Sequence, residues 1–210
     1  MPGPGGAQAP HPTPSREDIA VLEPFEQLPL SCIELVRDAA HAQRVIDALA
    51  QAPVLGFDTE SRPTFVRDEA SSGPHVVQLA TRRNAYVFQL EDARCVALLA
   101  ELLAADVVRK VGFGLGDDLR RILRKLGVQP RGVLDLNDLF WQRGYRRDIG
   151  VRAAVAVMFQ RRFAKSRKAT TSNWARADLT PAQLLYAAND AYAALRVFEA
   201  LHARDAGAPG

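Results

Sequence analysis

The hydrophobic pattern divides the chain into short extended segments and longer amphipathic ones. Apolar runs bounded by turn residues predict strands over residues 32–37, 54–60, 75–80, 85–88, 107–111 and 132–136. Apolar positions three and four apart predict helices over residues 39–49, 93–104 and 119–126, and a largely helical chain after residue 136. The polar turn 81–84 joins its two strands at hairpin spacing, which predicts antiparallel neighbours.

Capping residues mark where two of these helices begin. Asp38 precedes the helix over 39–49, and Thr180 with Gln183 forms a capping box around Pro181 at the start of a long C-terminal helix. A hairpin followed by alternating strands and helices indicates one mixed sheet with helices packed on it. We therefore expect an α/β fold, a mixed β-sheet flanked by α-helices in a single domain.

Composition limits the size and the setting of this domain. The 210 residues, 48% apolar and 24% charged, suffice for one domain with a sizeable core. The first 14 residues are rich in Pro and Gly, so we expect disordered tails over residues 1–18 and 205–210 around a domain over 19–204. No apolar run reaches the roughly 18 residues of a membrane span, and no secretory signal is recognisable. This favours a cytoplasmic protein without a membrane partner.

The cysteine content restricts the metal chemistry that the chain can support. Cys32 and Cys95 are too few and too far apart for a disulfide framework or a Cys-based zinc site. A bound metal ion would therefore need oxygen ligands.

Two carboxylates lie close together on one predicted strand. Asp58 and Glu60 are two residues apart in the segment VLGFDTE, so both project from the same face of the sheet. They would repel each other unless a positive group lay between them. Taken alone, the pair also fits a strand that ends in solvent.

A glycine-rich turn and two further aspartates precede the helix after the fifth strand. Asp118 shares a helix face with the apolar Ile122, so we expect it to point inward, and we assign the N-cap role to Asp117. The glycines of GFGLG also invite a dinucleotide-binding interpretation. However, their spacing is GxGxG rather than GxGxxG, and two carboxylates at the helix start would repel a pyrophosphate.

The C-terminal helix carries a tyrosine and an aspartate one turn apart. Tyr186 and Asp190 lie in a segment that is apolar on nearly every side, which predicts a buried helix. A buried carboxylate is costly unless it is paired or bound to metal, and a salt bridge to an arginine is the alternative. A set of hard oxygen ligands, suited to two Mg²⁺ or Mn²⁺ ions that flank a scissile phosphate, comprises Asp58, Glu60, Asp118 and Asp190.

Three segments, VLGFDTE, KVGFGLGDDL and LLYAANDAYAAL, resemble the exonuclease motifs of the DEDD superfamily. Tyr186, four residues before Asp190, is similar to the tyrosine that marks the DEDDy branch. The resemblance extends from about Val54 to Phe198 and includes TTSNW over residues 170–174. The chain most resembles the exonuclease domain of Werner-type helicases and its free-standing bacterial relatives.

This resemblance implies a ribonuclease H-like fold and two-metal 3′-to-5′ exonucleolysis. It implies that Asp58, Glu60 and Asp190 hold the first metal ion. Asp58 would bridge to the second ion, Asp118 would bind that ion through water, and Tyr186 would orient the nucleophile. The chain departs from the family pattern at Ser61, where an aromatic residue is usual, and at Asn189, where Thr is usual.

The middle third of the chain is strongly cationic although the whole chain has a net charge of only +3. Between Arg109 and Lys168, sixteen lysines and arginines face five aspartates. In the run over residues 161–168 we predict that Lys165, Arg167 and Lys168 contact phosphates, with a solvated helix end as the alternative. Trp174 follows this run, and we favour packing over base stacking for it.

The combined pattern predicts a metal-dependent 3′-to-5′ exonuclease acting on single-stranded or 3′-recessed DNA ahead of RNA. A ribonuclease D-like RNA trimmer is the alternative enzyme. That family usually carries further helical domains, and only 20 residues follow Asp190 here. A noncatalytic nucleic-acid-binding module is a third hypothesis, which the four intact carboxylates disfavour.

Overall fold

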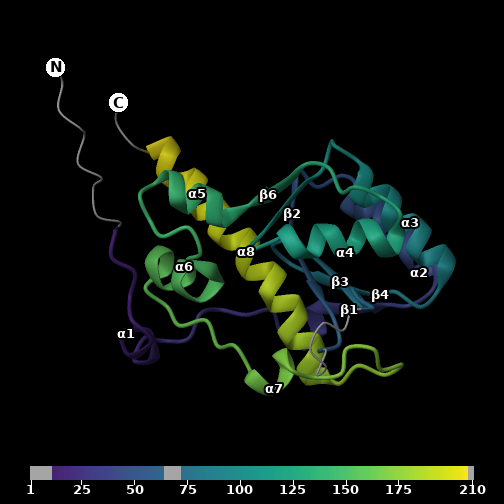
Figure 1. Ribbon diagram of the computed structural model, residues 1–210, viewed down its shortest axis with the longest axis horizontal. Helices are drawn as coiled ribbons and strands as arrows, with labels where there is room; N and C mark the ends of the chain where they lie inside the picture. Colours follow the sequence, from purple (N-terminus) through teal and green to yellow (C-terminus); the bar gives the residue numbers. More distant parts are fainter. Residues whose placement is uncertain (1–10, 64–71, 208–210) are drawn as a thin grey trace.

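The computed structural model describes residues 11–63 and 72–207, and its centre is a six-stranded sheet in the order β1-β4-β3-β2-β5-β6 (Figure 1). β3 is antiparallel to both of its neighbours, β2 and β4, whereas the other adjacent pairs are parallel. This confirms the mixed sheet and the hairpin. The strands are β1 (Ile33–Val36), β2 (Val54–Glu60), β3 (Val76–Ala80), β4 (Ala85–Gln89), β5 (Arg109–Gly112) and β6 (Val133–Asp135).

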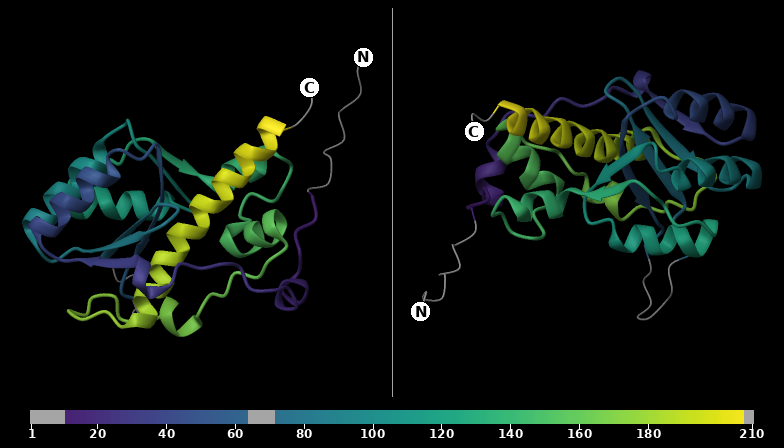
Figure 2. Two further views of the ribbon diagram at one scale, coloured as in Figure 1. Left: turned by 180° about the vertical axis from the view of Figure 1, so that it is seen from behind. Right: turned by 90° about the horizontal axis from the view of Figure 1, so that it is seen from above.

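Helices cover both faces of this sheet. The last helix, α8, runs across one face, as the left view of Figure 2 shows, and it packs there with α5 and α6. α2, α3 and α4 pack on the other face. The helices are α1 (Arg16–Ala20), α2 (Ala39–Leu49), α3 (Ala93–Ala104), α4 (Gly116–Leu126), α5 (Leu136–Gln142), α6 (Gly150–Phe159), α7 (Arg167–Thr170) and α8 (Pro181–Gly207), with a 3₁₀ turn η1 (Leu30–Cys32). Within the described ranges, no helix combines the length and apolar character that crossing a membrane requires.

Strand β2 alternates strictly between the two faces. Leu55 and Phe57 pack into the core under α2, α3 and α4, so Gly56, Asp58 and Glu60 face α8. A Cβ atom on Gly56 would collide with the carbonyl oxygen of Ala191 in α8. The missing side chain therefore lets α8 approach β2 closely, and it does so one residue beyond Asp190.

The capping residues predicted from the sequence are present. Thr180 Oγ1 accepts a hydrogen bond from the Gln183 backbone nitrogen at 3.2 Å, and the Thr180 backbone nitrogen donates to Gln183 Oε1 at 3.0 Å. Asp38 Oδ1 accepts from the backbone nitrogen of His41 at 2.9 Å. The starts of α8 and α2 are thus confirmed as capped helix N-termini.

Asn189 has a structural role that explains one departure from the family pattern. Its buried amide accepts a hydrogen bond from the Leu28 backbone nitrogen at 2.8 Å and donates one to the Leu28 carbonyl oxygen at 3.2 Å. The segment that precedes β1 is thereby attached to α8 immediately before Asp190.

The predicted tails are too long at both ends. α1 begins at Arg16, because Ser15 and Asp18 form a reciprocal capping box with bonds of 3.1 and 2.9 Å. α8 continues past residue 204 to Gly207, and Asp205 forms an ion pair with Arg143. The outermost parts of both predicted tails, residues 1–10 and 208–210, lie outside the described residues.

Two further local predictions are wrong. The chain after residue 136 is not helical throughout, since residues 160–166 and 171–180 are extended or turn segments. Asp117 is not the N-cap of α4, because the helix begins earlier, with Leu115 in that position, and Asp117 pairs with Arg120 instead. The carboxylate of Asp135 accepts hydrogen bonds from the backbone nitrogens of Gly114 and Leu115 at 3.0 and 2.8 Å, which stabilises this turn.

We predict that Gly56→Ala destabilises the protein by about 1–3 kcal/mol, the usual cost of overpacking a core. The added methyl group must push α8 away from β2. Urea unfolding measures the stability of both variants and the wild type. Gly116→Ala is the matched control, because a Cβ at Gly116 meets nothing within 4 Å. Equal stability of Gly56→Ala and the wild type would contradict the close packing of α8 on β2.

Candidate active site

Three of the predicted carboxylates meet where α8 crosses β2. Asp58 and Glu60 come from the strand and Asp190 from the helix, and one oxygen atom of each lies within 4.8 Å of the others. Asp190 is 5% exposed. The structure therefore brings together the residues that the sequence predicted as ligands of a first metal ion.

The fourth carboxylate, Asp118, lies beside this cluster but outside it. Thr59 Oγ1 donates a hydrogen bond to Asp118 Oδ1 at 2.5 Å, from the face of β2 opposite to its two acidic neighbours. Asp118 is partly buried. Thr59 was missed in the sequence, although strand alternation between Asp58 and Glu60 places it on the α4 side.

The cluster holds more negative charge than a buried site tolerates. Burial raises the pKa of Asp58 well above its usual value, and the carboxylates of Asp190 and Asp118 raise it further. Burial, then Asp58 and Asp190, raise the pKa of Glu60 to about 10. At neutral pH the cluster therefore requires protons or a cation, and metal binding would release protons.

Lys165 supplies one such cation. It lies on the extended segment between α6 and α7, and its Nζ is 2.9 Å from Asp190 Oδ2 and 5.5 Å from the centre of the Tyr186 ring. Burial lowers the pKa of Lys165, but Asp190, Tyr186 and Asp58 together raise it more, so the ammonium stays charged. The salt-bridge alternative for Asp190 is thus realised by a lysine. In this state Lys165 binds a carboxylate, which differs from the expected phosphate contact.

The residues of the cluster fit a divalent cation. Both oxygens of Asp190 are buried, and neither accepts a well-oriented hydrogen bond from the described residues, so the Lys165 ammonium is the group that a metal ion would displace. A cavity of about 70 Å³ opens on Asp58 and Asp190, with Phe57 and Phe113 in its wall. Hard, buried carboxylate oxygens around a small cavity are the donors that Mg²⁺ and Mn²⁺ prefer.

Tyr186 lies at the edge of the cluster with its hydroxyl fixed. A hydrogen bond of 3.0 Å joins Thr170 Oγ1 and Tyr186 Oη, and the ring centre is 6.0 Å from that of Trp174. Trp174 is fully buried, which confirms that it packs rather than stacks on a base. Thr170 was missed as a partner, although it is the first residue of the TTSNW segment.

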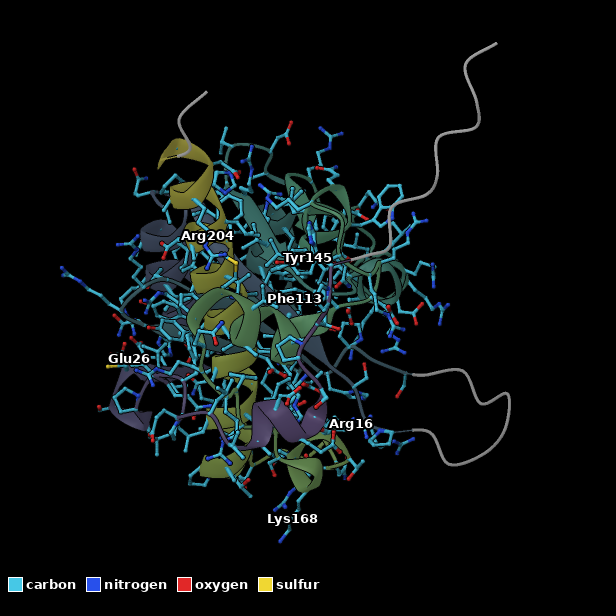
Figure 3. All side chains as sticks on the ribbon, turned by 90° about the vertical axis from the view of Figure 1, so that its left-hand side faces the viewer. Arg16, Glu26, Phe113, Tyr145, Lys168 and Arg204 are labelled. Atoms are coloured by element: carbon cyan, nitrogen blue, oxygen red, sulfur yellow. The ribbon has the colours of Figure 1, made fainter. Side chains whose placement is uncertain are left out.

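Of the two remaining predicted phosphate contacts, the structure describes the side chain of Lys168 alone. Lys168 is exposed, and Figure 3 shows its side chain pointing away from the body of the protein below α7. Arg167 starts α7, but its side chain lies outside the described part of the chain. Contact of these two residues with phosphates stays a prediction.

Comparison with known proteins shows the family to which the chain belongs. A family model described as 3′-5′ exonuclease matches residues 33–204. Mouse WRN, a bifunctional 3′-5′ exonuclease and ATP-dependent helicase, is 26% identical over 155 residues, which is 73% of this chain and 11% of that protein. The chain spans about half or less of the length of the curated relatives it matches.

Solved structures share the fold. The EXO domain of Aedes aegypti Nibbler superposes with a TM-score of 0.71 at 23% identity, covering 86% of this chain and 92% of that one. Escherichia coli RNase D, an exoribonuclease involved in structured RNA processing, superposes with a TM-score of 0.70 at 19% identity, covering 82% and 45%. The predicted α/β architecture of a ribonuclease H-like exonuclease domain is thereby confirmed.

We predict that Lys165→Met binds Mn²⁺ more tightly than the wild type in the absence of nucleic acid. A metal ion must displace the lysine ammonium from Asp190, and the variant removes that competitor. We expect the affinity for Mn²⁺ to rise by up to about tenfold, which corresponds to about 1.4 kcal/mol. Free Mn²⁺ measured by electron paramagnetic resonance gives the affinity, with Lys168→Met as the control. Weaker binding by Lys165→Met would show instead that the lysine supports the metal site.

Proposed function

Because this chain belongs to the 3′-5′ exonuclease family of the DEDD superfamily, we propose that it removes nucleotides from the 3′ end of DNA with the help of two divalent ions, Mg²⁺ or Mn²⁺. Members of this family are metal-dependent nucleases. The observation that carries the proposal is the convergence of Asp58, Glu60 and Asp190 within 4.8 Å, with Tyr186 one helical turn from Asp190. A noncatalytic binding module has no need of such a costly cluster.

The side chains divide the work between holding metal and orienting water. When bound, two divalent ions would supply the Lewis acidity for water activation and for stabilising the leaving oxygen. Asp58, Glu60 and Asp190 would hold one ion, and Asp118 with Asp58 would hold the other. Thr59 keeps Asp118 in place through its 2.5 Å hydrogen bond.

Tyr186 is placed to orient the attacking water. Burial raises the pKa of its phenol, and the Asp190 carboxylate raises it further, so the hydroxyl stays protonated at neutral pH. Thr170 Oγ1 is hydrogen-bonded to the phenolic oxygen at 3.0 Å, which fixes the hydroxyl beside Asp190. The hydroxyl therefore orients a water by hydrogen bonding and does not remove its proton.

DNA is the first candidate substrate because the motifs resemble those of Werner-type exonuclease domains, and mouse WRN, a 3′-5′ exonuclease and helicase, is among the relatives. RNA is the second candidate, because the fold is also that of E. coli RNase D, whose substrate is RNA. In both cases the substrate would be single-stranded or have a recessed 3′ end, since the strand must be threaded to buried carboxylates.

Labelled DNA and RNA oligomers incubated with Mg²⁺, Mn²⁺ or a chelator test this proposal. We expect DNA with a 5′ label to shorten progressively from its 3′ end, and the chelator to stop the reaction. Asp190→Asn should abolish activity while the protein stays folded, because it removes charge that the metal ions require and that the metal-free site must otherwise tolerate. Faster loss of RNA would favour the second candidate. Full activity of Asp190→Asn, with folding checked by thermal melting, would refute the active site.

We predict that Tyr186→Phe lowers kcat at least about tenfold, the effect of one positioned hydrogen bond of about 1.4 kcal/mol. The ring and its packing against Trp174 remain, so nucleic-acid affinity should change little. Thr170→Val is the matched control, because it removes the partner of the hydroxyl but not the hydroxyl itself. An equal loss of affinity in Tyr186→Phe would identify the tyrosine as a substrate or packing contact instead.

A further inference from the structure

A second cavity, of about 370 Å³, lies next to the carboxylate cluster and has no role in the proposed chemistry. It opens between the extended segment over residues 162–166 and helix α6, with the end of α1 at its rim. Lys165 lines both this cavity and the small one at Asp58 and Asp190. The two cavities are therefore adjacent at Lys165.

The charged residues that line this cavity are all basic. Arg152, Arg162 and Lys165 line it, and no acidic residue does. Many arginines of this chain pair with carboxylates, as Arg37, Arg82 and Arg143 do. Neither Arg152 nor Arg162 forms an ion pair with any described residue. In addition, the Nε of Arg162 is buried without a hydrogen-bond acceptor in the described part of the chain.

The backbone around Arg162 is held in place. Its nitrogen donates to the Glu23 carbonyl oxygen at 2.8 Å, and its carbonyl oxygen accepts from the Phe25 nitrogen at 2.9 Å. The next residue, Phe163, is 2% exposed and anchors the segment in the core. The buried, unpaired Nε of a partly exposed arginine on a fixed backbone carries a cost that an anionic ligand would offset.

We propose that Arg152 and Arg162 form a subsite for a phosphodiester of the substrate strand, adjacent to the phosphate that is cleaved. This rests on the proposed exonuclease function. The guanidinium fork matches the non-bridging oxygens of a phosphate and reads no base, as an enzyme that trims any sequence requires. The phosphate of a released mononucleotide could bind the same two arginines. The test therefore distinguishes a phosphodiester of the strand from the phosphate of the product.

Two substrates separate this subsite from the catalytic centre. One is a single-stranded DNA oligomer, and the other is the p-nitrophenyl ester of thymidine 5′-monophosphate, which contains only the phosphate to be cleaved. For Arg162→Met and Arg152→Met we expect kcat/KM to fall about tenfold or more on the oligomer, and to stay within twofold of wild type on the ester. Arg94→Met, at an exposed arginine on α3 across the sheet, should match the wild type on both.

If neither substrate is cleaved, the proposed function is contradicted but the subsite is not. Binding of the oligomer, measured without metal, then tests the subsite. In fluorescence anisotropy with a chelator present, the slope of log K against log salt should become shallower by about 0.7 for each arginine removed. An unchanged slope and an unchanged kcat/KM on the oligomer would refute the subsite. Equal losses on the oligomer and the ester would refute it as well, because they would indicate a damaged catalytic centre.

Binding of a released mononucleotide in this cavity would give a different result. If Arg162→Met relieved inhibition by thymidine 5′-monophosphate without changing the KM for the oligomer, the cavity would hold the product and the proposal would be wrong. Arg162→Lys, which keeps the charge but loses the fork, should recover part of the oligomer affinity. Its thermal melting point, compared with that of Arg162→Met, checks that both variants fold.

Discussion

The close contact between strand β2 and helix α8 is the constraint on which the active site depends. Because Gly56 has no side chain, the carbonyl oxygen of Ala191 can lie against the strand. Asp190 immediately precedes Ala191, so the packing of the core also sets the distance from this carboxylate to Asp58 and Glu60. Side-chain packing and metal-ligand geometry are therefore one requirement in this fold, and neither can relax without the other.

The second requirement is electrostatic, and it opposes the first. Close packing brings three carboxylates together, and Asp190 raises the pKa of both Asp58 and Glu60. Lys165 offsets part of this cost by its ion pair with Asp190. This ion pair helps the protein to fold before a metal ion binds. The site is nevertheless less stable than an apolar core would be. Local destabilisation of this kind is typical of functional sites.

Features that depend on short-range periodicity could be predicted from the sequence. The two-residue spacing of Asp58 and Glu60 fixes their shared face, and the apolar surroundings of Asp190 fix its burial. Features that depend on the path of the chain could not. Nothing local shows that Lys165, among five cations in eight residues, turns toward Asp190. The N-cap assigned to Asp117 failed because a carboxylate about 20 residues further along, that of Asp135, stabilises the turn.

The hydrogen bonds between Leu28 and Asn189 show that the packed domain begins before the segment that matches the family. The family match starts at residue 33, at the first strand. A protein trimmed there would keep every matched residue but would leave Oδ1 of the buried Asn189 without the hydrogen bond from Leu28, at a cost of about 1–3 kcal/mol. It would also remove the backbone groups that hold Arg162. Residues 23–28, which precede the family match, therefore belong to the packed structure of the domain.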